Sequence, residues 1–193
     1  MTSTVVLGVT ERFGHDDVRL VVIESSPNRR RILSQLDGDP VVAATERSDD
    51  VSAAIDAITT ELDRRREEAE PDSREQMVVV IGDLVELRRS HDDDLTARLD
   101  DILVDAAAPT SGIDVIAYAS ELDGAGPFAD AATHRLIGAS SNQDELAALG
   151  VPRPEQLDGI TGRCWAFPDD RIVQLATADT PIETLLRHRG GTG

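Results

Sequence analysis

The sequence predicts an α/β protein with three layers and a mostly parallel sheet. Continuous apolar runs, typical of strands that are covered on both faces, alternate with amphipathic segments at helical spacing. Strands that are joined through helices run parallel in one sheet and carry helices on its faces. The chain has 193 residues, 40% of them hydrophobic. Because that length suits one domain with its own core, we expect residues 1–193 to form a single domain.

Each element follows from a local pattern. The apolar runs predict parallel core strands at 18–24, 77–81, 113–119 and 134–139, and a shorter strand of the same kind at 39–45. Amphipathic spacing and capping residues predict helices at 2–13, 48–70, 92–108 and 142–150, and a last helix after residue 179. The segment 163–177 predicts a hairpin that turns at Pro168, Asp169 and Asp170.

Composition excludes several classes of protein. The net charge is −18, from 37 acidic and 19 basic residues. Such a surface repels phosphate backbones, so direct binding of nucleic acid is not expected. A salt-adapted or GC-rich source would also produce this acidic composition, which contains no lysine. One cysteine cannot form a disulfide within the chain, and this favours a reducing cytoplasm.

Metal and nucleophile patterns are absent from the sequence. The histidines and the cysteine are too widely spaced to form a ligand motif, so we expect surface or structural roles for His15, His91, His134, His188 and Cys164. Cys164 lies in a predicted strand beside Trp165, where a packed thiol is expected rather than a reactive one.

A complete phosphate-binding loop is also absent. The loop motif GxxxxGK[ST] needs a lysine to pair with the phosphates, and the sequence has none. The first residues, MTSTVVLGVTERFG, nevertheless look like the helix that follows such a loop, with Thr2, Ser3 and Thr4 at the loop's end. These three residues are weak candidates for nucleotide binding. We expect the chain to start at an edge left by truncation or by loss of a strand.

The stretch MVVVIGDLVEL, from Met77 to Leu87, raises the main functional question. In a Walker B strand, the terminal aspartate orients magnesium and the next glutamate polarises the attacking water. Gly82 and Asp83 occupy those two places here. Glycine cannot hold a metal, and aspartate is one methylene shorter than glutamate. Either Asp83 merely caps a turn or helix, or the pair is a degenerate catalytic site.

Several segments, taken in order, resemble the FtsK/SpoIIIE-type ATPase domain. The resemblance is closer to the degenerate C-terminal modules of EccC-type ATPases of type VII secretion. It covers almost the whole chain and rests on the following segments: VRLVVIESSPNRRRILSQLDGDPVVAAT, AAIDAITTELDRRRE, MVVVIGDLVEL, SGIDVIAYAS, THRLIGASSNQDELAALGVP and GRCWAFPDDRIVQLA. It implies a RecA-like P-loop NTPase fold, with the phosphate loop absent or degenerate.

Three departures from that family bear on activity. The acidic pair is Gly82-Asp83, the sensor-like pair after the next strand is Ala119-Ser120, and the phosphate loop is missing. The resemblance therefore implies a cytoplasmic module without efficient ATP hydrolysis and without a bound cofactor. It implies a structural, regulatory or docking role beside adjoining ATPase modules. Contact with a membrane would come only through other parts of the assembly.

Two alternatives stay open. A phosphate loop upstream of Met1 would make the chain an active translocase subunit that binds ATP and magnesium. An unrelated α/β binding domain that binds no nucleotide would also fit the composition.

Two surfaces are candidates for partner binding. Arg29, Arg30 and Arg31 form one of the few basic clusters. They are either solvated charges in the first turn of a helix or a contact for an acidic neighbour, such as an adjoining ATPase module or a helical export substrate. The second candidate is an apolar groove near the late hairpin, around Trp165 and Phe167.

Overall fold

The computed structural model describes residues 18–34, 40–67, 76–121, 124–138, 143–157 and 163–175. The chain divides into two compact units, the first ending at Ala131 and the second beginning at Ala132. The helices expected at 2–13 and after residue 179 lie outside the described residues, and so do Thr2, Ser3 and Thr4.

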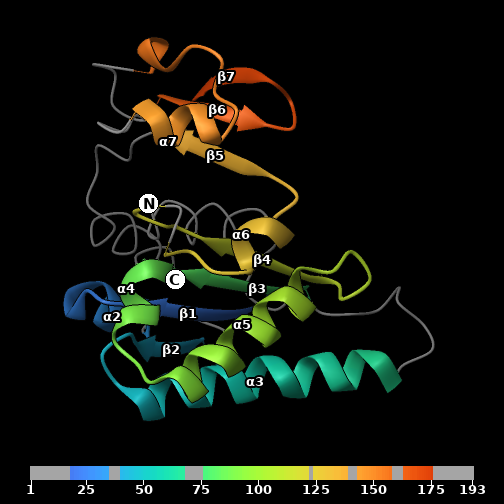
Figure 1. Ribbon diagram of the computed structural model, residues 1–193. Coiled ribbons are helices and arrows are strands. Elements are labelled where there is room, and N and C mark those ends of the chain that lie inside the picture. Colours follow the sequence, from blue (N-terminus) through green and yellow to red (C-terminus); the bar gives the residue numbers. More distant parts are fainter. Residues whose placement is uncertain are drawn as a thin grey trace, which may run out of the picture. The chain divides into compact units, whose positions relative to one another are not determined.

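A parallel sheet organises the first unit (Figure 1). Its described strands follow the order β2-β1-β3-β4, and every neighbouring pair is parallel. They are β1 (Val18–Glu24), β2 (Val41–Ala44), β3 (Gln76–Ile81) and β4 (Ile113–Ala117). The parallel α/β core predicted from the sequence is confirmed. Strand β4 ends two residues earlier than expected, so Tyr118 and Ala119 lie beyond it.

Four described helices lie between these strands in the chain, and a fifth, α6, follows β4. They are α2 (Pro27–Leu33), α3 (Ser48–Glu67), α4 (Leu84–Arg89), α5 (Asp93–Ala107) and α6 (Phe128–Ala131). Helix α5 begins after Asp92, whose side chain accepts a hydrogen bond from the backbone N–H of Leu95. Two further acids stand in its first turn, where the helix dipole favours negative charge. The aspartate-rich segment therefore starts this helix as predicted.

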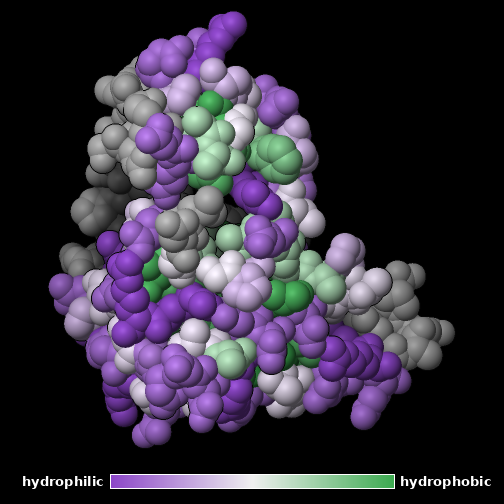
Figure 2. Space-filling model, in the orientation of Figure 1, coloured by the Kyte–Doolittle hydropathy of each residue, from purple (hydrophilic) through white to green (hydrophobic). Residues whose placement is uncertain are grey.

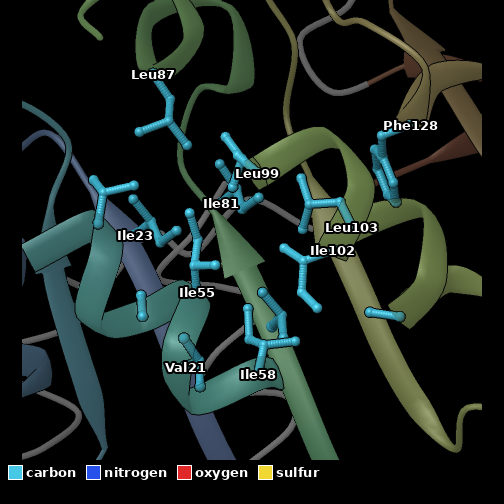
Figure 3. Close-up of a cluster of buried hydrophobic side chains, with 14 of the residues drawn as sticks. Val21, Ile23, Ile55, Ile58, Ile81, Leu87, Leu99, Ile102, Leu103 and Phe128 are labelled. Carbon is cyan, nitrogen blue, oxygen red and sulfur yellow. The ribbon is translucent and has the colours of Figure 1, made fainter. Parts of the chain in front are cut away.

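The main core lies between the sheet and helices α3 and α5 (Figure 3). Val21, Ile23 and Ile81 point from the sheet toward Ile58 of α3 and Leu103 of α5. On the strands, the alternate residues Leu20, Val22, Val78 and Val80 are buried as well. Because successive side chains on a strand point to opposite faces, both faces of the central strands are covered. That explains why their sequences are continuous apolar runs.

The second unit contains an antiparallel sheet with strand order β5-β6-β7. Its elements are β5 (Arg135–Gly138), α7 (Gln143–Ala148), a 3-10 turn at Pro154–Gln156, β6 (Arg163–Phe167) and β7 (Arg171–Gln174). The predicted hairpin is confirmed, with its turn between Phe167 and Arg171. Gly150 follows α7 with a φ of 79°, as expected of a helix stop.

One strand prediction is wrong. The segment 134–139 was expected in the parallel core, but β5 pairs antiparallel with β6 in the separate sheet. Its residues alternate between half-buried and exposed, so the strand is covered on one face only. Such one-sided burial is typical of antiparallel sheets, and four residues were too few to reveal that alternation in the sequence.

Candidate functional site

The carboxyl ends of the parallel strands define the candidate site. In open α/β sheets, ligands bind outside this edge. The strand ends are held together by backbone hydrogen bonds. The N–H of Gly82 donates to Ile23 at 2.8 Å, the N–H of Leu84 donates to Tyr118 at 2.8 Å, and the N–H of Tyr118 donates to Ile81 at 3.1 Å. The residues that follow β1, β3 and β4 therefore form one continuous edge.

The carboxylate of Glu24 lies close to the place where a side chain at position 82 would begin. A Cβ built on Gly82 would stand 3.2 Å from the carboxylate carbon and from both carboxylate oxygens of Glu24. Gly82 is not among the glycines with positive φ, so its backbone does not demand glycine. The close approach of Glu24 is what a side chain at this position would meet.

The carboxylate of Glu24 is buried and already bound. Its side chain is 1% exposed. Oε1 accepts hydrogen bonds from the N–H of Ser26 at 3.1 Å and from the hydroxyl of Ser25 at 3.4 Å. One guanidinium nitrogen of Arg29 lies 3.4 and 3.2 Å from the two carboxylate oxygens. The guanidinium of Arg29 therefore faces the single acid buried at this edge of the described sheet.

Arg30 closes the neighbouring part of the edge. Its Nη1 donates to the carbonyl oxygens of Glu24 and Ser25, each at 2.8 Å. The same guanidinium pairs with Glu46 beyond the end of β2, with Nη2 to Oε1 at 2.8 Å. The hydrogen bond from Arg30 lowers the pKa of the Glu46 carboxyl below its ordinary value. Arg30 thus donates hydrogen bonds to carbonyl oxygens at the strand end, and these oxygens are not free to accept from a ligand.

The basic cluster of the sequence divides into two kinds of residue. Arg29 and Arg30 each pair with an acid of the fold, Arg29 with Glu24 and Arg30 with Glu46, although Arg29 is exposed and Arg30 is half-buried. Arg31 is exposed. Helix α2 has only seven residues, so Arg30 and Arg31 already stand in its last turn. Cations are favourable in the last turn of a helix, where they complement the helix dipole. Replacing all three arginines together would disturb folding, and Arg31 alone tests the surface role.

Asp83 caps helix α4. Its Oδ1 accepts hydrogen bonds from the N–H of Val85 at 3.0 Å and of Glu86 at 3.3 Å. The residue has extended backbone angles, as an N-cap residue does. The capping alternative raised by the sequence is therefore realised in the structure. A carboxylate committed to two backbone amides is poorly placed to polarise a water.

The other candidate positions along this edge offer little chemistry. Ala119 and Ser120 are exposed just beyond β4. His91 sits near the end of β2, with Nε2 at 2.6 Å from the carbonyl oxygen of Thr45 and Nδ1 at 3.1 Å from the hydroxyl of Ser48. Both ring nitrogens are engaged, as expected of a structural histidine. Within the described residues, no group of three or more His, Cys, Asp or Glu side chains could hold a metal ion.

Trp165 and Phe167 share one face of the second unit's sheet but differ in burial. Trp165 is half-buried and packs against the cluster formed by Leu146, Val151 and Leu157. Phe167 is 44% exposed, and the guanidinium of Arg135 lies over its ring, 5.6 Å from the ring centre. Cys164 is buried, and this burial raises the pKa of its thiol, so the expectation of an unreactive cysteine fits.

Glu24 is the residue that sequence reasoning missed. It ends a continuous apolar run, VRLVVIE, just as Gly82 follows another. Two parallel strands that end in register place their following residues side by side. The acid at the end of one apolar run could therefore have been predicted to lie near the glycine that follows the other. What the sequence could not show is that β1 and β3 are neighbours.

No family model matches the chain, and no curated protein matches it either. Among solved structures, the chain is similar to ATPase domains 2 and 3 of EssC from Geobacillus thermodenitrificans. That match has a TM-score of 0.75 and 15% sequence identity and covers 96% of this chain.

A second solved structure is similar over most of the chain. It is the monomer form of TcpA, the pCW3 conjugation coupling protein, with ATPγS, at a TM-score of 0.70 and 15% identity over 97% of this chain. The chain has the fold of these proteins. The expected resemblance is thereby confirmed at the level of fold. The chain spans 39% of the EssC chain and 61% of the TcpA chain. None of the helices in the described ranges is long and apolar enough to cross a membrane.

Proposed function

We propose that this chain is a module of a secretion or translocation motor that does not itself hydrolyse ATP efficiently. The similar EssC structure contains two ATPase domains in one chain, and this chain spans 39% of it. A module of this kind works beside other ATPase modules, in a structural, regulatory or substrate-docking role. Its place is the cytoplasmic side of an assembly whose membrane contacts lie in other parts.

The proposal rests on the acids at the carboxyl-terminal edge of the sheet near Gly82. Phosphoryl transfer needs acidic side chains that hold magnesium and position the attacking water. Position 82 has no side chain, and a Cβ added there would stand 3.2 Å from the carboxylate of Glu24. That carboxylate faces Arg29, and Asp83 serves as a helix cap. Each acid near the expected catalytic place already has a structural partner.

The alternative is an active subunit whose phosphate loop lies upstream of this sequence. The TcpA structure with ATPγS is the observation that keeps this alternative in view, because a protein of similar fold was studied with a nucleotide. Under the alternative, the complete protein would bind ATP and magnesium, with Thr2, Ser3 and Thr4 near the phosphates. The glycine at position 82, where the family has an acid, would then reduce the rate of ATP hydrolysis rather than abolish ATP binding.

Nucleotide binding separates the two proposals. A fluorescent ATP analogue should be titrated with magnesium against the purified chain and against the natural protein that contains any upstream segment. We expect no saturable binding below about millimolar concentration in either sample, since a Kd of 1 mM corresponds to only about 4 kcal/mol. Magnesium-dependent binding at micromolar concentration in the longer protein would support the alternative. The same affinity in the isolated chain would contradict the proposed loss of the site.

Assembly is tested separately from nucleotide binding. The chain, mixed with the adjoining ATPase module of its own system, should form a complex that sedimentation or size-exclusion chromatography detects. An Arg31→Ala variant should fold normally, because this side chain is exposed and forms no ion pair with another residue in the described part of the chain. Weaker assembly of that variant at low salt would assign the surface role to Arg31, and unchanged assembly would exclude it.

A further inference from the structure

One face of the second unit's sheet brings aromatic, apolar and basic side chains together. In the antiparallel register, Arg135 stands opposite Phe167, Ile137 opposite Trp165, and Trp165 opposite Ile172. Paired residues project to the same side of a sheet, so these five side chains share one face. We refer to this set as the hairpin face.

The hairpin face is covered at one end and open at the other. Ile137 and Trp165 pack against the small apolar cluster beneath α7. Phe167 is 44% exposed and Ile172 is 37% exposed. Figure 2 shows hydrophobic residues at the surface of the second unit, among hydrophilic ones. Exposed apolar side chains that lie next to one another are typical of binding surfaces.

Two buried donors on the same face lack an acceptor. Nε of Arg135 and Nε1 of Trp165 are enclosed without a hydrogen-bond partner in the described structure. Within the described residues, Arg135 also forms no ion pair, and its one specific contact is the ring of Phe167. Buried donors normally have a hydrogen-bond acceptor. Two donors without one on the same face indicate that a bound partner supplies the acceptor.

The charge of the sheet is opposite to that of the chain. The three strands carry Arg135, Arg163 and Arg171 and contain no aspartate or glutamate, whereas the whole chain has a net charge of −18. The turn between β6 and β7 adds Asp169 and Asp170, and Asp169 pairs with Arg171 on the opposite face of the sheet. On the hairpin face, Arg163 donates to the carbonyl oxygen of Gln156, which leaves Arg135 as the cation at the open end. Electrostatic complementarity therefore favours an acidic occupant at this end.

We propose that the open end of the hairpin face binds a protein segment that presents a carboxylate next to a large apolar side chain. The apolar side chain covers Phe167 and Ile172, and the carboxylate pairs with the guanidinium of Arg135. Guanidinium and carboxylate groups form strong charge-assisted hydrogen bonds, and these lend direction to an otherwise apolar contact. The site is independent of nucleotide chemistry, because it rests on the second unit alone.

Random twelve-residue peptides displayed on phage, selected on the immobilised full-length chain, provide the probe. We expect the selected peptides to be enriched in an aspartate or glutamate beside a large apolar residue. Selection on an Arg135→Gln variant should lose the acidic enrichment. Two controls change the opposite face of the same strands: Arg171→Gln removes an exposed arginine, and Leu136→Ser removes a side chain that is 54% exposed. Both controls should keep the enrichment.

Binding of one selected peptide can then be measured directly. Trp165 is the chain's single tryptophan, so its fluorescence reports events at this face without a label. The affinity should fall about tenfold in Arg135→Gln, the loss that corresponds to about 1.4 kcal/mol for a charge-assisted contact, and should weaken with added salt. Circular dichroism and the thermal midpoint confirm that each variant is folded. Arg135→Gln is the deciding variant, since it leaves the apolar packing unchanged.

Several outcomes would overturn the proposal. Peptides without acidic bias, an equal loss in Arg171→Gln, or no enrichment above the uncoated support would each exclude the site as described. Sedimentation of the chain alone addresses a second copy as the occupant. If the chain self-associates and Arg135→Gln returns it to a monomer, the face belongs to a contact between copies, and the partner segment is the wrong occupant.

Discussion

Glu24 and Gly82 are the two residues on which the account depends most. A side chain at 82 would meet a carboxylate that is buried and already paired. Gly82→Asp, the change that restores the usual acid, places a second carboxylate against the first. We expect a loss of about 2–3 kcal/mol in the free energy of unfolding, because uncompensated buried charge is among the costlier single changes. Urea denaturation measures this loss.

A double-mutant cycle checks the cause. Glu24→Gln removes the opposing charge, so it should recover part of the loss when it is combined with Gly82→Asp. Neighbouring residues in contact show coupling energies of about 0.5–3 kcal/mol, whereas distant residues add. Strictly additive losses would show that the two positions do not interact.

Arg29 and Arg31 form a matched pair two residues apart. Arg29→Ala deprives the buried Glu24 of its guanidinium, and we expect a loss of about 1–3 kcal/mol. The loss stays below that of a fully buried pair because the Arg29 side chain is 47% exposed. Arg31→Ala removes an exposed charge and should change stability by less than about 0.5 kcal/mol. Equal effects of the two variants in thermal unfolding would contradict the role assigned to Arg29.

At the scale of elements, helix α3 is tied to the sheet by a buried ion cluster. Glu61 accepts from Nε of Arg65 at 2.5 Å and from Nη2 of Arg64 at 2.6 Å. Arg65 in turn donates to the carbonyl oxygen of Gly112, at the turn before β4. Glu61 and Arg65 are both buried, and each neutralises the charge of the other. Removing either residue would leave an unpaired buried charge. The end of α3 is thereby fixed to the start of β4.

This cluster predicts a pH dependence of stability. Burial acts to raise the pKa of Glu61, but hydrogen bonds from Arg64 and Arg65 outweigh it and hold the pKa below its ordinary value of 4.5. A lowered pKa in the folded state stabilises the protein above the unfolded value, and this stabilisation is lost as pH falls through 4.5 and below. Glu61→Gln should therefore flatten the fall in unfolding free energy in that range. An unchanged slope in urea titrations at a series of pH values would remove Glu61 from the acid response.

The elements that the sequence predicted well are those with strong local signals. The central strands are buried on both faces and read as apolar runs, and the aspartates before α5 mark its start. Strand β5 was assigned to the wrong sheet because four residues do not reveal which partner they pair with. Pairing between distant segments is decided by packing, and packing is not local in the sequence.

Only part of the candidate site could be predicted from the sequence, because the rest depends on which strands are neighbours. The glycine at position 82 and the capping role of Asp83 follow from residue types next to a strand. The roles of Glu24, Arg29 and Arg30 depend on β1 lying beside β3 and on a short helix turning back over the edge. The unpaired donors of Arg135 and Trp165 likewise appear only after β5 and β6 are paired.

At the scale of the whole molecule, the acidic surface sets the response to salt. A net charge of −18 on 193 residues makes the folded state repel itself, and salt screens that repulsion. We expect the thermal midpoint to rise between about 0.1 M and 1 M potassium chloride, where the screening length falls from about 10 Å to about 3 Å. A midpoint that falls over this range would show that the surface ion pairs matter more than the net charge.

Turnover of ATP by the purified chain tests the central claim most directly. Phosphate release should be measured with magnesium on the wild-type chain and on the double variant Gly82→Asp with Asp83→Glu. We expect no turnover above background in either, because the double variant still lacks a phosphate loop and its new acid faces Glu24. Turnover in the usual enzyme range of about 1–10³ s⁻¹ by the wild-type chain, or its appearance in the double variant, would contradict the account.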